Sequence, residues 1–112
     1  MKITTNHFEN ESYSCRDCEK SFSKNEINTD NWKCDECEKK ILINIPNEKH
    51  NIVRLNPNEM TEEDCVFDQR TEEFFQLKGI AFKGGKHHIG IKNFGVIKVE
   101  ENDFINCMWN DQ

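Results

Sequence analysis

Short apolar and β-branched runs, separated by turn-forming residues, dominate the second half of the chain and predict a series of short strands. The runs lie at residues 52–55, 65–67, 73–82, 86–92, 96–99 and 104–109. Gly84 and Gly85 predict a hairpin turn between two of them, because glycine adopts positive φ without steric cost. Gly79 predicts a bulge inside the longest run, and residues 59–64 predict one helical turn. The pattern therefore indicates a small antiparallel β-structure.

The run at residues 86–92 alternates so that His87, Ile89 and Ile91 fall on one face. His88 falls on the opposite face for the same reason. The two adjacent histidines are therefore not expected to bind one metal ion together.

The first half of the chain has a different sequence pattern, with two Cys-x-x-Cys pairs separated by fifteen residues. The four cysteines are Cys15, Cys18, Cys34 and Cys37. Two thiolates three positions apart on a tight turn can face one ion, and two such turns complete a tetrahedron. The spacing therefore predicts a structural Zn²⁺ site.

The flanks of the two cysteine pairs repeat one pattern. An aromatic residue precedes each pair by two positions and an apolar residue follows it by four; they are Tyr13, Phe22, Trp32 and Ile41. Each half-site is thus expected to be a short hairpin with its aromatic ring packed beside the sulfurs. On these residues, positions 12–43 resemble the zinc-ribbon and rubredoxin-like group. That group usually carries glycine after the second cysteine of each pair, where this chain has Glu19 and Glu38.

Three other chemistries can use cysteines of this kind. An iron-bearing electron carrier would need the same four ligands and nearby aromatic rings. A thioredoxin-like redox pair would need a βαβ setting, which the pattern does not provide. A catalytic zinc ion would need an open coordination position, which four thiolates close.

The predicted fold is mainly β, with an N-terminal four-cysteine zinc ribbon followed by a small antiparallel β-barrel or half-barrel. Residues 55–66, with the acidic pair Glu63-Asp64 before a strand, resemble the opening strand and long loop of SH3-like barrels. The expected organisation is a flexible lead-in at 1–11, the ribbon at 12–45, a linker at 46–51 and the β-domain at 52–112.

Composition and charge bear on the cellular location of the protein and on the state of its cysteines. The chain has 21 acidic and 15 basic residues among 112, for a formal net charge of −6. No apolar run reaches the length that crosses a bilayer, and no secretory signal opens the chain, so a cytoplasmic location without membrane contact is expected. In a reducing cytoplasm, cysteines serve as metal ligands or free thiols rather than disulfides. Cys65 and Cys107 are expected to be core residues, with a second metal site left open as the alternative.

The sequence shows no nucleophile elbow, no carboxylate pair in a clear pocket and no phosphate-binding loop. We therefore expect no catalysis and no small-molecule substrate. The leading hypothesis is a module that offers a sheet edge or a hairpin to a protein partner. The candidate contacts are the acidic stretch at 59–73 and the exposed members of the aromatic set. A variant of this hypothesis is an acidic inhibitor that occupies a nucleic-acid-binding groove.

The alternative hypothesis is a nucleic-acid-binding accessory protein that uses the hairpin at 75–98. Five lysines interleave there with Phe82 and Phe94; they are Lys78, Lys83, Lys86, Lys92 and Lys98. Basic residues beside aromatic rings can follow a phosphate backbone and stack bases. The net charge of −6 opposes this hypothesis, because phosphate contacts dominate such affinity.

Overall fold

A computed structural model describes residues 1–5 and 7–110. Within them the protein is mainly β, with one antiparallel sheet of nine strands and two 3-10 turns. The strands are β1 (Ser12–Cys15), β2 (Lys20–Phe22), β3 (Leu42–Asn44), β4 (Ile52–Leu55), β5 (Cys65–Asp68), β6 (Glu73–Lys83), β7 (Lys86–Ile91), β8 (Gly95–Val99) and β9 (Ile105–Met108). The 3-10 turns are η1 (Lys24–Glu26) and η2 (Pro57–Glu59).

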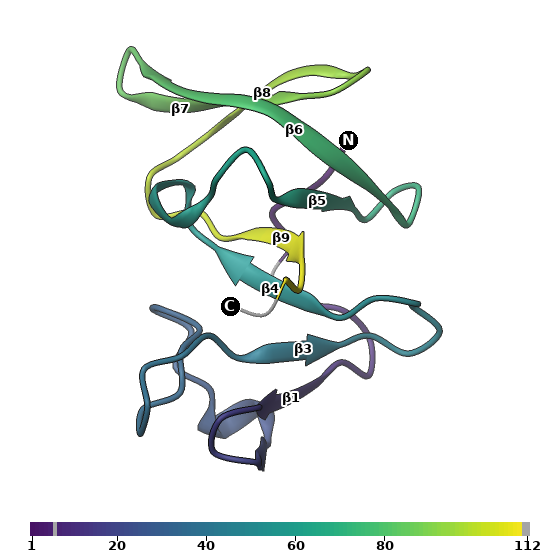
Figure 1. Ribbon diagram of the computed structural model, residues 1–112, viewed down its shortest axis with the longest axis vertical. Helices are drawn as coiled ribbons and strands as arrows, with labels where there is room; N and C mark the ends of the chain where they lie inside the picture. The colour runs from purple at the N-terminus through teal and green to yellow at the C-terminus, as the bar shows by residue number, and fades with distance from the viewer. Residues whose placement is uncertain (6, 111–112) are drawn as a thin grey trace.

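The strands follow the order β2-β1-β3-β4-β9-β5-β6-β7-β8, so that the last strand of the chain lies in the middle of the sheet (Figure 1). Cys107 of β9 pairs with Val53 of β4 on one side and with Val66 of β5 on the other. Strands β2 and β8 lie at the two ends of this order, and the sheet does not close. A closed barrel, one of the two architectures expected for the second half, is therefore not formed.

The strands predicted in the second half are confirmed with small differences at their ends. The predicted run at 52–55 coincides with β4, and the other five runs overlap β5 to β9. Gly84 and Gly85 take φ of 58° and 79°, which gives the hairpin the positive φ that its two central positions require. The register between β6 and β7 shifts at Gly79, as the bulge predicted there requires.

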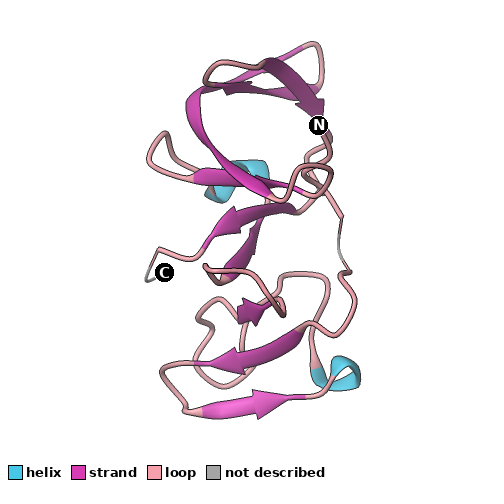
Figure 2. Cartoon of the chain, turned by 90° about the vertical axis from the view of Figure 1, so that its right-hand side faces the viewer, coloured by secondary structure: helices cyan, strands magenta, loops and turns pink. Residues whose placement is uncertain are grey.

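Strand β6 bends over its length and folds the last hairpin back over the sheet (Figure 2). Its residues 73–76 pair with β5, and its residues 77–83 pair with β7. The inner face of β7 and β8 thereby packs on the central strands. The buried residues of this core are Ile3, Val53, Leu55, Met60, Val66, Leu77, Ile89, Ile91, Val99, Ile105 and Cys107.

The sheet runs across the linker expected at 46–51. Ile43 of β3 pairs with Ile52 of β4, so these residues form the connection between two paired strands. A second apolar cluster joins residues of the cysteine-rich half, such as Tyr13 and Trp32, to Phe67 and Phe104 of the second half. The two predicted units thus share one sheet and one of its two cores.

The segment expected to be a flexible lead-in packs against the sheet in its described residues. The backbone N–H of Lys2 donates to Asp68 Oδ1 at 2.8 Å, and the N–H of Asn106 donates to the Ile3 carbonyl at 2.9 Å. Ile3 is only 2% exposed and belongs to the core under β7 and β8. Met1 also packs against that core, and Phe8 packs against the second one, so apolar side chains as well as these backbone hydrogen bonds join the segment to the sheet.

Arg54 of β4 is fully buried and paired with a carboxylate from the same N-terminal segment. Its Nη1 and Nη2 donate to the two oxygens of Glu11 at 2.8 and 2.9 Å, and its Nε donates to Asn106 Oδ1 at 2.9 Å. Burial alone raises the pKa of Glu11, but hydrogen bonds from Arg54 and Tyr13 outweigh it and hold that pKa below its ordinary value. Glu11 therefore carries its negative charge beside the Arg54 guanidinium, and both side chains have further hydrogen-bond partners, Tyr13 for Glu11 and Asn106 for Arg54.

Replacing Glu11 by alanine is expected to lower the free energy of unfolding by about 3–5 kcal/mol, because the Arg54 charge would remain buried without its partner. The measurement is denaturant unfolding of the metal-loaded protein, followed by tryptophan fluorescence. Glu9→Ala serves as the matched control, because Glu9 lies exposed in the same segment. A loss below about 1 kcal/mol for Glu11→Ala would show that the pair is not needed.

Candidate metal centre

The four cysteines of the two pairs meet at one end of the molecule. Cys15 ends β1 and Cys18 lies in the turn after it, whereas Cys34 and Cys37 come from the loop before β3. Their sulfur atoms all lie within 4.8 Å of one another, with 3.4 Å between Cys15 and Cys37 and 3.9 Å between Cys18 and Cys34. Four sulfurs at about 2.3 Å from one ion lie about 3.8 Å apart in a tetrahedron. The predicted cluster is thus confirmed as a set that can hold a metal ion.

Backbone N–H groups turn toward two of the sulfurs. Burial opposes ionisation of Cys34, but the N–H groups of Cys37 and Glu36 donate to its sulfur and bring its pKa below the ordinary value. At Cys15, burial outweighs the N–H donated by Cys18, and the pKa of the thiol is raised. Each turn therefore offers a donor to the first cysteine of its pair.

The crowding of the thiols opposes the ionisation that metal binding needs. Contact with the Cys37 sulfur, followed by burial, raises the pKa of Cys18 to about 12. A divalent cation reverses this effect, since a coordinating thiol loses its proton outright. A cation at the centre of the cluster would therefore favour the ionised form of these thiols.

Two glutamates stand in the left-handed backbone region at the points where the zinc-ribbon turns that this segment resembles usually carry glycine. Glu19 has φ 53° and Glu38 has φ 62°, each directly after the second cysteine of its pair. The N–H of Glu38 donates to the Cys34 carbonyl at 2.8 Å and closes the second turn. The sequence departs from the glycine pattern, but the backbone conformation is kept at a steric cost.

The aromatic residues ahead of each pair pack as predicted, in one cluster with Cys15 and Cys34. Tyr13 and Trp32 are both buried, with ring centroids 6.2 Å apart. The sequence did not predict a further partner of Trp32: the Arg54 guanidinium lies over its ring, 4.3 Å from the ring centre. Trp32 thereby connects the cysteine cluster to the buried Arg54–Glu11 ion pair of the central sheet.

Lys40 makes a second connection between the cysteine loop and the second half, and sequence reasoning missed it. Its Nζ donates to the carbonyls of Asn31 at 2.8 Å and Arg54 at 3.1 Å, and to Glu59 Oε1 at 2.7 Å. Burial lowers the pKa of Lys40, while Glu59 acts in the opposite direction. Lysine is ordinarily exposed, so nothing in the local pattern signalled this burial.

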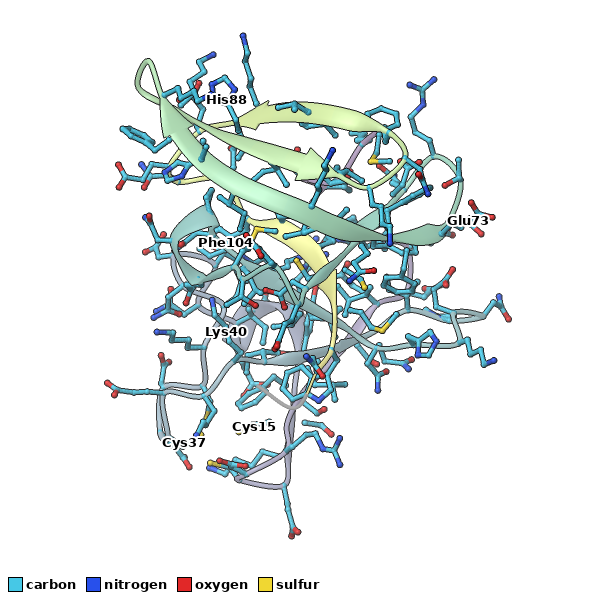
Figure 3. The ribbon with its side chains drawn as sticks, turned by 45° about the horizontal axis from the view of Figure 1, so that its top comes forward. Cys15, Cys37, Lys40, Glu73, His88 and Phe104 are labelled. Atoms are coloured by element: carbon cyan, nitrogen blue, oxygen red, sulfur yellow. The ribbon has the colours of Figure 1, made fainter. Side chains whose placement is uncertain are left out.

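The five lysines of the alternative hypothesis lie at the other end of the molecule. Lys78 and Lys83 belong to β6, Lys86 to β7 and Lys98 to β8, and Lys92 follows β7. All five are exposed, and Lys86 lies 3.2 Å from Glu100 in an ion pair. In Figure 3, His88 of the same hairpin is far from Cys15 and Cys37. The lysines and the cysteines therefore form two separate regions.

The remaining cysteines and histidines do not add a second metal cluster among residues 1–5 and 7–110. Cys107 is fully buried, as predicted, whereas Cys65 is only half-buried. His87 is buried and His88 half-buried on opposite faces of β7, which confirms the predicted alternation.

No protein-family model, no curated protein and no solved structure matches this chain. The resemblance of positions 12–43 to zinc ribbons therefore rests on the four cysteines and their two turns. The resemblance of the second half to SH3-like barrels rests on strand pattern alone. In the described part of the chain, no helix has the length and apolarity needed to cross a membrane.

Replacing Glu38 by glycine is expected to raise the free energy of unfolding by about 0.5–1 kcal/mol. Glycine removes a left-handed strain of about 1–2 kcal/mol, and the added freedom of the unfolded chain offsets about 0.4–1 kcal/mol of this gain. The measurement is denaturant unfolding of the metal-loaded protein.

The matched control is Asp35→Gly, because Asp35 lies in the same turn and is exposed but is not among the positive-φ residues. That variant is expected to lose stability, since it gains only unfolded-state freedom. Equal effects from the two variants would contradict the role assigned to backbone strain.

Proposed function

We propose that this protein is a non-enzymatic protein-interaction module whose first half is held by one structural Zn²⁺. The observation that supports it is the contrast between its two ends. One end gathers four buried or half-buried cysteine sulfurs within 4.8 Å of one another. The other end exposes large apolar side chains to solvent.

Zinc is proposed because its tetrahedral preference for four sulfur ligands matches the cluster. Iron would accept the same ligands, and the two metals are separated by colour, since a ferric tetrathiolate absorbs visible light and Zn²⁺ does not. Four thiolates would fill the coordination shell and leave no position for water or a substrate. The bound ion would therefore hold the fold of the ribbon rather than act on a substrate.

The proposal of a protein partner rests on where the apolar surface lies. The described residues leave three large hydrophobic side chains exposed: Phe82 at 61%, Phe94 at 53% and Val96 at 61%. All three belong to the meander formed by β6, β7 and β8 and its turns. Isolated apolar side chains are normal on a surface. The proposal therefore rests on all three falling in this one meander, with Phe82 paired to His87 and Val96 paired to Gly90.

The purified protein is expected to contain one zinc per chain, and Cys37→Ser is expected to lose tight binding. Because structural zinc sites supply folding energy, on the order of 10 kcal/mol, the cysteine-rich half should unfold when the metal is lost. The measurements are elemental analysis and amide hydrogen exchange, before and after chelation. Cys65→Ser is the control, because Cys65 lies outside the cluster.

A visible absorption band from bound iron would contradict zinc. A fully protected cysteine-rich half in the metal-free Cys37→Ser variant would contradict a structural role for any metal.

The double variant Phe82→Ser/Val96→Thr is expected to reduce protein capture at least tenfold without loss of stability, because both side chains are already exposed. The measurement is chemical crosslinking in lysate of the source cells, followed by mass spectrometry. Phe22→Ser is a comparison at the metal end, where the ring is half-buried. Specific capture that is equal for the wild type and the double variant would move the interaction to another surface, and no specific capture would contradict the proposed function.

A further inference from the structure

The outer face of the β6, β7 and β8 meander contains an open groove of about 450 Å³. Gly79 and Ala81 of β6 and Gly90 of β7 contribute to its lining, together with Val96 of β8. His88, labelled in Figure 3, also lies along it. The groove therefore crosses all three strands of the meander.

The floor of the groove is low because two glycines face each other across β6 and β7. Gly79 pairs with Gly90, and a Cβ added to Gly90 would lie 3.3 Å from the Gly79 carbonyl oxygen. Val96 pairs with Gly90 from the other side, and its side chain is 61% exposed. An apolar wall thus rises beside a floor of bare backbone.

Positive charge surrounds this apolar surface. Lys78 and Lys83 line the groove, and Lys98 pairs with His88 on the neighbouring strand. Glu62 is the acidic residue among the described lining residues, and Lys86 is already paired with Glu100. The lining thus carries two lysines and one carboxylate, and Lys98 adds a third positive charge beside it, on a chain whose total charge is −6.

We propose that this groove binds an extended acidic segment of a partner protein. One or two apolar side chains of the segment lie over the Gly79 and Gly90 floor, and its carboxylates contact Lys78, Lys83 and Lys98. An apolar centre inside a charged rim is the anatomy of a protein interface, and charge complementarity selects the acidic partner. The inference rests on the proposed function and names the surface and the chemistry of its partner.

A single-stranded nucleic acid fits this groove less well. Base stacking needs aromatic platforms, and among the described lining residues the imidazole of His88 is the one aromatic ring. Phe82 and Phe94 lie outside the lining. The total charge of −6 also repels a polyanion at long range, whereas a short acidic segment meets mainly the local lysines.

The test is a fluorescence-anisotropy titration of the zinc-loaded full chain with a fluorescein-labelled decapeptide of alternating Glu and Leu. The comparison probes are the Lys and Leu counterpart and a twenty-nucleotide oligothymidylate. The acidic peptide is expected to bind at least tenfold more tightly than the basic one. Its affinity should fall at 300 mM salt, because exposed charge pairs are screened.

Two variants remove the two parts of the groove separately. Lys83→Glu/Lys98→Glu reverses the charge of the rim and is expected to lower the affinity for the acidic peptide at least tenfold. Gly79→Val fills the floor without a change of charge, since a Cβ there meets only Glu62 Oε1, at 4.0 Å. Valine also suits a strand, so the fold is expected to persist and only binding to fall. Lys24→Glu/Lys49→Glu is the matched charge control, at exposed positions outside the groove, and should bind normally.

The proposal is overturned if the acidic peptide does not bind, or if the basic peptide binds equally well. It is also overturned if oligothymidylate binds more tightly and loses affinity in the lysine variant, which would make the groove a nucleic-acid site. Crosslinking of the Gly79→Val variant separates the two levels of inference. A partner captured equally well by that variant leaves the interaction function standing and removes only the groove.

Discussion

The buried guanidinium of Arg54 is the constraint on which the arrangement of the chain depends. It is fully excluded from solvent on β4, the strand where the two halves of the molecule meet. An uncompensated charge at such a place costs several kcal/mol, so its neighbours must supply a carboxylate and acceptors. Glu11 comes from the N-terminal segment, Asn106 from β9 and Trp32 from the cysteine loop. One side chain thereby fixes the positions of three segments that are distant in sequence.

The cysteine cluster and the Arg54–Glu11 ion pair are in contact through Trp32. Trp32 packs near Tyr13 and Arg54, and its backbone has φ 54°, an unusual conformation for a bulky residue. Glu19 and Glu38 hold similar strain in the two cysteine turns. Such strain persists only where the surroundings over-determine the conformation, and four bonds to one ion would do so. Glu19, Trp32 and Glu38 thus place three of the described positive-φ residues at the cysteine cluster, where the binding energy of a metal ion would offset their strain. The other described non-glycine residues with positive φ lie elsewhere in the chain: Asn10, Asn47, Glu72 and Asn93.

At the opposite end of the molecule, the meander of β6, β7 and β8 has one buried face and one exposed face. The bend of β6 places the inner face of the last hairpin on the core, which leaves its outer face to solvent. Glycines at 79 and 90 lower that face, and lysines surround it. The four-cysteine cluster and the accessible sheet surface are thus separated along a molecule with a longest dimension of 38 Å.

The sequence by itself determined the local elements and the ligand set of this protein. Alternation at 86–92 predicted β7, because side-chain periodicity along a strand is a local record of which face is buried. The short β-branched run at 52–55 predicted β4, which is buried along its whole length. The spacing of the four cysteines likewise predicted that their sulfurs meet. Only the tertiary structure decided that β9 lies between β4 and β5, that Ile3 enters the core, and that Arg54 and Lys40 are buried. Those features depend on partners distant in sequence, 19 residues between Lys40 and Glu59 and 43 between Arg54 and Glu11. An isolated charged residue carries no periodic signal of the acceptors that will enclose it.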